Sequence, residues 1–111
     1  MLLDFNAIEE QAIPHMRGGE KEANMRIYQD GLCKIIRGRL VPGASIGLHT
    51  HATDSETIYI LSGSGKVLYD GVYEPLTAGS CHYCPNGHAH SLINDSDADL
   101  TFFAVIPVHK A

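Results

Sequence analysis

Short apolar runs separated by glycine-containing turns are the feature of this 111-residue sequence that most restricts its fold. The turns are Asp30-Gly31, Pro42-Gly43, Ser62–Gly65, Asp70-Gly71, Ala78-Gly79 and Pro85–Gly87. Glycine accepts a positive φ without strain, so such turns join antiparallel strands. The spacing predicts about nine short strands and no long helix, which is an all-β sandwich or barrel.

The N-terminal segment lacks this strand pattern. Residues 6–12 are predicted to form a short helical turn, because Asn6 can cap it and Pro14 would end it. The alternative is a loosely held arm. We therefore divide the chain into an N-terminal arm, residues 1–24, and a β-barrel domain, residues 25–111.

Composition restricts the partners. The net charge is -5 and the eight Lys and Arg residues are dispersed, which argues against nucleic acid. No apolar run approaches the roughly 18 residues of a membrane span, and Met1–Asp4 lacks the basic segment of a secretory signal. Three cysteines without framework spacing do not suggest a disulfide scaffold. A cytoplasmic protein without a membrane partner is expected.

Two histidines one residue apart lead into a carboxylate. On a strand, His49 and His51 point to the same face and can converge on one cation. Glu56 begins the next apolar run and can reach the same point from a neighbouring strand. A fourth ligand is available at His90 if the fold brings it there.

These residues fall into two spaced sets. The first set is Gly43, His49, His51, Glu56 and Gly63, and the second is Gly79, Pro85, Gly87, His90 and Asn94. Their order and spacing resemble the two signature motifs of the cupin superfamily, both complete. The motifs span residues 43–94, and the sequence is identified as a small single-domain, cupin_2-like protein.

The resemblance implies a double-stranded β-helix, or jelly-roll barrel, with a divalent metal inside its mouth. Carried over by position, the metal ligands are His49, His51, Glu56 and His90. Imidazole and carboxylate ligands suit a divalent transition metal: Mn, Fe, Ni, Co, Cu or Zn.

Further side chains are candidates for the pocket around the metal. Ile58 and Ile60 share strand parity with Glu56 and are expected to line its wall. The other pocket-lining candidates are Cys84, either a small core residue or a thiol near the metal, and His88, at the rim or on the surface.

The catalytic residues are left open by the sequence. The candidates are His82, if its side chain points inward, and Tyr59. A metal-bound water is a third alternative for moving the proton.

The expected function is that of a metal-binding cupin, as an enzyme of the dioxygenase, decarboxylase or isomerase type. Its substrate would be a small oxygenated metabolite: a carboxylate, keto-acid or sugar acid. The alternatives are a ligand-binding or sensor cupin without turnover, and a sugar or uronate isomerase that needs no oxidant. A homodimer formed through the spare N-terminal segment, Met1–Tyr28, is also expected.

Overall fold

The computed structural model describes residues 1–109 and is built almost entirely from antiparallel strands. The elements are β1 (Gln11–Pro14), the 3-10 turn η1 (Met16–Gly18), β2 (Glu22–Gln29), β3 (Cys33–Leu40), β4 (His49–Thr50), β5 (Glu56–Ser62), β6 (Ser64–Tyr69), β7 (Val72–Thr77), β8 (Cys81–Cys84), β9 (Ala89–Ile93) and β10 (Leu100–Pro107). No helix among these residues is long and apolar enough to cross a membrane.

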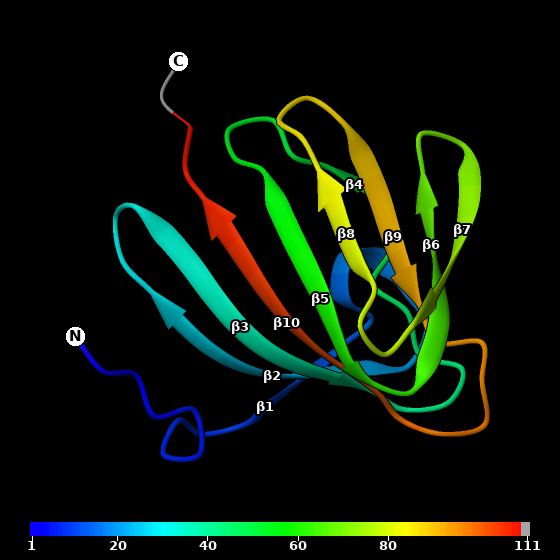
Figure 1. Cartoon of the computed structure of the whole chain (residues 1–111), viewed down its shortest axis with the longest axis horizontal. Helices are drawn as coiled ribbons and strands as arrows, with labels where there is room; N and C mark the ends of the chain where they lie inside the picture. The colour runs from blue at the N-terminus through cyan, green and yellow to red at the C-terminus, as the bar shows by residue number, and fades with distance from the viewer. Residues whose placement is uncertain (110–111) are drawn as a thin grey trace.

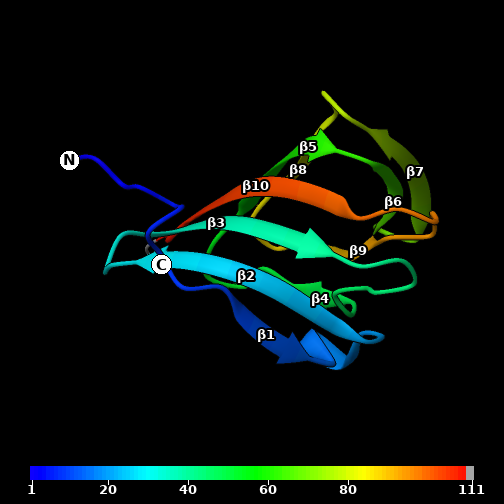
Figure 2. The same cartoon turned by 90° about the horizontal axis from the view of Figure 1, so that it is seen from below.

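The strands form two sheets that face each other across the core (Figures 1 and 2). A six-stranded sheet has the order β1-β2-β3-β10-β5-β8, and a four-stranded sheet has the order β4-β9-β6-β7. The last strand, β10, pairs with both β3 and β5 in the middle of the larger sheet. The predicted all-β architecture is confirmed.

The core follows from the alternation of side chains along each strand. On β5, for example, Glu56, Ile58 and Ile60 are buried, whereas Thr57 and Tyr59 face outward. The buried apolar cluster draws on both sheets and comprises Ala23, Met25, Ile36, Leu40, Ala44, Ile46, Ile58, Ile60, Val67, Leu76, Leu92, Leu100, Phe102 and Ala104.

Two local predictions are wrong. Residues 6–12 do not form a helical turn, because Gln11–Pro14 is drawn into β1 by pairing with β2. The strand on which His49 and His51 were expected is reduced to His49–Thr50, with a single bridge from Ser45 to Ile93. In β1, long-range pairing with β2 overrides the local propensity.

Several of the first ten residues contact the six-stranded sheet, whereas Met1 and Leu2 are almost fully exposed. Arg26 Nη1 donates to the carbonyl of Ile8 over 2.5 Å, and Arg39 pairs with Glu10 over 2.8 Å. The Phe5 ring meets Phe103 edge-on at 5.7 Å. The division into an arm at 1–24 and a barrel at 25–111 stays a prediction, and β1 and the start of β2 lie within the first range.

Candidate metal centre

Four side chains from separate parts of the chain meet between the two sheets. His49 on β4 lies directly opposite His90 on β9 in the antiparallel register. His51 follows β4, and Glu56 begins β5 on its inward-facing side. One ligand atom from each of His49, His51, Glu56 and His90 lies within 4.8 Å of all the others.

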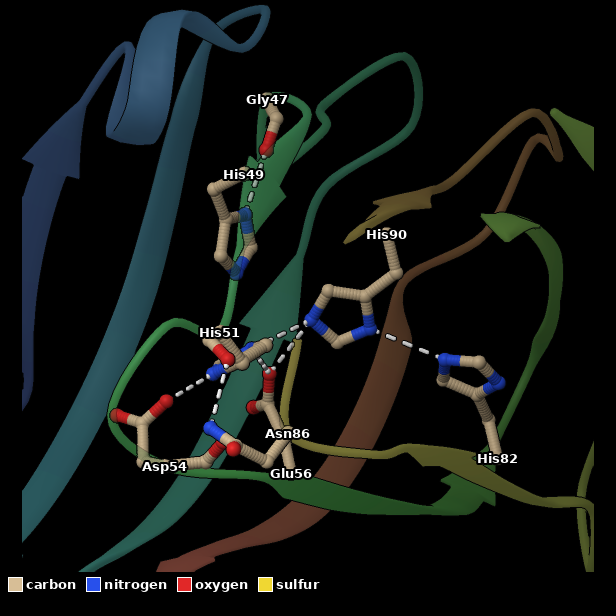
Figure 3. A network of polar contacts seen from close by, with 8 residues as sticks. All are labelled: Gly47, His49, His51, Asp54, Glu56, His82, Asn86 and His90. Carbon is tan, nitrogen blue, oxygen red and sulfur yellow. Dashed lines mark hydrogen bonds and ion pairs between the residues drawn. The ribbon is translucent and has the colours of Figure 1, made fainter. Parts of the chain in front are cut away.

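The three imidazoles surround a common point (Figure 3). The ring centroids of His49, His51 and His90 are 4.8 to 4.9 Å apart, and their planes are inclined by 63° to 71°. The rings therefore present their edges to one another, as donors to one ion would.

Distances among three of the four donor atoms fit neighbouring ligands of one ion. The His51 and His90 Nε2 atoms are 2.9 Å apart, and Glu56 Oε1 lies 3.1 and 2.9 Å from them. Adjacent ligands of an octahedral ion with bonds of about 2.1 Å lie about 3.0 Å apart. The nitrogen and carboxylate donors also suit divalent transition metals. These residues therefore fit the ion that their sequence pattern implies.

Two of the histidines are oriented by acceptors close in sequence. His49 Nδ1 lies 2.8 Å from the carbonyl oxygen of Gly47, and His51 Nδ1 lies 2.6 Å from Asp54 Oδ1 (Figure 3). Each acceptor favours a proton on Nδ1, which makes Nε2 the ring atom that can bind an ion.

The third histidine is oriented by a residue of the other sheet. His90 Nδ1 lies 3.0 Å from Nε2 of His82, which projects inward from β8. Both side chains are buried. Burial lowers the pKa of His82 to about 4, so its ring is neutral near pH 7.

Backbone hydrogen bonds join the two sequence motifs at two places. Gly43 N donates to the carbonyl of Asn94 over 3.0 Å, and Gly87 N donates to the carbonyl of His51 over 2.7 Å. The Asn86 amide also donates to the His51 carbonyl over 3.0 Å. The turn before β9 thus fixes the loop that carries His51.

The charges of the site are coupled. Burial alone would raise the pKa of Glu56, but its hydrogen bonds with His51 and His90 outweigh burial and bring the pKa to about 2. The hydrogen bond to Glu56 raises the pKa of His51, whereas burial lowers that of His49. The carboxylate is therefore ionised at any physiological pH.

The four residues open into a cavity of about 60 Å³. Its walls are mostly apolar, and the apolar lining residues are Met16, Met25, Ile27, Ile36, Ile46, Ile58, Leu92 and Ile106. Arg17, Lys34 and Asp54 also line it. A volume of this size holds about four water-sized spheres, which suits a ligand of a few non-hydrogen atoms.

The other candidate residues lie at different places. Ile58 lines the cavity, whereas Ile60 and Cys84 are buried outside its lining. Burial raises the pKa of the Cys84 thiol to about 11. Tyr59 faces away from Glu56, and the residue is 46% exposed. His88 is outside the cavity lining, with Nδ1 2.5 Å from Asp70 Oδ2.

Sequence reasoning missed residues that the fold brings to the site. Asp54 and Gly47 orient histidines, but nothing in their local pattern distinguishes them from ordinary loop residues. Arg17 lies in η1, within the N-terminal segment, and the sequence pattern did not connect that segment with the site. Lys34 could have been found, because it shares strand parity with the buried Ile36.

Comparison with known proteins adds a family and a near relative. The model of the cupin domain family matches residues 37–106. A Thermotoga maritima protein named oxalate-binding protein is 34% identical over 112 residues, which cover 96% of this chain and 93% of that protein.

Solved structures share the whole fold. The crystal structure of a predicted oxalate decarboxylase from Thermotoga maritima matches with a TM-score of 0.91 and 33% identity, over 97% of this chain and 99% of that one. A sugar phosphate isomerase from a cupin superfamily, from Silicibacter pomeroyi, matches with a TM-score of 0.79 and 24% identity, over 96% and 75% of the two chains. The second match supports the fold alone.

Proposed function

Because this chain belongs to the cupin domain family, we propose that it binds a divalent transition metal and, through it, a small dicarboxylate of the oxalate class. The observation that carries the proposal is the convergence of three oriented imidazoles and one ionised carboxylate at a small apolar cavity. His49, His51, Glu56 and His90 would hold the ion.

The charge of the cavity favours a dianion. The carboxylates of Asp54 and Glu56 offset the cations Arg17 and Lys34. With neutral histidines, a divalent ion then leaves a net charge of about +2, which a dicarboxylate neutralises. The name of the Thermotoga relative, an oxalate-binding protein, supports the same ligand class.

The residues of the chain have separate tasks in this binding. The apolar walls, among them Ile58 and Leu92, exclude water and so strengthen electrostatic interactions inside the cavity. Lys34 and Arg17 attract the carboxylate groups. The metal, when bound, acts as a Lewis acid toward the ligand oxygens.

Metal analysis and calorimetry test the proposal. Protein purified without chelators or a nickel column should contain one transition-metal ion per chain. Oxalate should bind the metal-loaded protein and should not bind the His51→Ala variant. Binding of oxalate to metal-free protein, or of neutral sugars in preference to oxalate, would contradict it.

Turnover is tested on the same material. Oxalate decarboxylation would yield formate and carbon dioxide, and carbon-13 NMR can measure both products. The reaction would consume no oxygen. Within residues 1–109, the carboxylates lining the cavity, Asp54 and Glu56, are both hydrogen-bonded to histidines. Formation of both products would support the enzymatic alternative, and oxalate binding without either product would support a ligand-binding cupin.

A homodimer in the cytoplasm remains part of the proposal. The predicted contact through Met1–Tyr28 stays a prediction. Tyr59, Leu61 and Tyr83 on the neighbouring strands β5 and β8 form a second exposed surface that association would cover. Light scattering at micromolar concentration should give twice the chain mass of 12.1 kDa, and a monomer would contradict the dimer.

A further inference from the structure

We infer that His82 is a positioning residue for the metal ligand His90, fixing its tautomer and ring orientation through the hydrogen bond between their imidazoles. The inference rests on the proposed metal site. His82 Nε2 lies 3.0 Å from His90 Nδ1, and the exposed fractions of the two residues are 5% and 1% (Figure 3).

The direction of this hydrogen bond is determined by metal binding. A histidine that ligates through Nε2 carries its proton on Nδ1, so His90 must donate. His82 must then accept at Nε2 and carry its own proton on Nδ1. The opposite arrangement would place a proton on His90 Nε2, the atom that faces His51 and Glu56.

The surroundings of His82 favour the required tautomer. The carboxylate of Glu74 lies 3.6 Å from His82 Nδ1, which is too long for a hydrogen bond but close enough to favour a proton there. His82 and Glu74 both line a side cleft of about 480 Å³ between β7 and β8. His90, His82 and Glu74 thus lie in succession from the candidate metal site to that cleft.

The buried position makes the acceptor necessary. If His82 is replaced by an apolar residue, the Nδ1 proton of His90 loses its partner in a place where it is 1% exposed. His90 can then rotate or change tautomer, and either change weakens the ligand. Removal of such supporting partners usually weakens metal binding about 10- to 100-fold.

Two variants separate positioning from packing. His82→Leu removes the acceptor, and we expect metal affinity to fall about 10- to 100-fold. His82→Gln supplies an amide oxygen as acceptor and should restore affinity to within about threefold of the original protein. Leu100→Val alters a buried side chain on β10 outside the cavity lining and should leave metal affinity unchanged.

Nitrogen-15 NMR of the zinc-loaded protein gives the readout that packing alone would not change. The original protein and His82→Gln should both show a protonated, hydrogen-bonded Nδ1 on His90, and His82→Leu should lose that signal. Circular dichroism checks that each variant is folded.

The outcomes also separate this inference from the proposed function. If the original protein binds metal and His82→Leu binds it equally well with an unchanged His90 signal, the inference is overturned and the metal site stands. If the original protein binds no transition metal, both are overturned.

Discussion

Gly19 and Gly47 approach each other so closely that neither position can carry a side chain. A Cβ on Gly47 would lie 1.9 Å from the carbonyl oxygen of Arg17 and 2.9 Å from Gly19 N. A Cβ on Gly19 would lie 2.0 Å from the Ser45 carbonyl oxygen. This contact seats η1 against the segment that enters β4, and it places Arg17 at the cavity.

Substitution of Gly47 by alanine should therefore lower the stability of the protein and disturb the metal site. The added methyl group must displace backbone atoms, and such overpacking costs about 1 to 3 kcal/mol of unfolding free energy. Because the Gly47 carbonyl orients His49, metal affinity should fall about tenfold. Thermal unfolding and metal titration measure the two effects. Gly31→Ala, where a Cβ would meet no atom within 4 Å, is the control and should change neither.

Substitution of Glu56 by glutamine should weaken metal binding by about tenfold or more, since it removes the one negative charge among the ligands. Metal competition with a chromophoric chelator measures the affinity. The exposed Glu9→Gln change is the matched control for charge. Equal affinity in both variants would exclude Glu56 as a ligand.

Lys34→Met should weaken oxalate binding while leaving metal binding intact. The substitution keeps most of the length of a half-buried side chain that lines the cavity and removes its charge. Loss of one charge-assisted contact predicts about tenfold weaker binding. Calorimetry on the metal-loaded protein provides the test, with Lys66→Met, on the other sheet, as control. An unchanged oxalate affinity would place the ligand elsewhere.

Attachment of the N-terminal arm should depend on pH. The hydrogen bond from Arg39 lowers the pKa of Glu10 below its ordinary value of 4.5. The pair therefore contributes stability above pH 4.5, and the contribution is lost as pH falls through the lowered pKa. A partly exposed pair contributes about 0.5 kcal/mol.

Hydrogen exchange of residues 4–13 measures this attachment. The original protein should exchange more slowly than Glu10→Gln at about pH 6, and the difference should shrink as the pH falls below the ordinary pKa of 4.5. A constant difference between the two proteins across that range would contradict the assignment.

Much of the fold could be predicted from the sequence because its turns are marked by glycine. Gly43, Gly63, Gly71, Gly79 and Gly87 all have positive φ, and each falls where a turn was expected. β1 could not be predicted, because Gln11–Pro14 has no alternating pattern and becomes a strand only through its pairing with β2.

The four candidate ligands could be predicted, because their spacing in the sequence matches a known pattern. The structure brings His49, His51, Glu56 and His90 together, whereas the acceptors that orient them are fixed by the path of the backbone. His82 was expected to point inward only as one alternative. The contact of His82 with Nδ1 of His90 depends on the register of β8 against β5, in which His82 lies opposite Ile58.

The three acceptors, Gly47, Asp54 and His82, come from different parts of the chain, so one part of the site could be transferred to another protein more easily than the rest. Residues 47–56 hold two histidines, the glutamate and the acceptors of both rings in one continuous stretch. Transplanted into another barrel with the same loop path, this peptide would bring most of a coordination sphere already oriented. His90 would arrive without support, and the recipient would have to provide a partner for it from an adjoining strand.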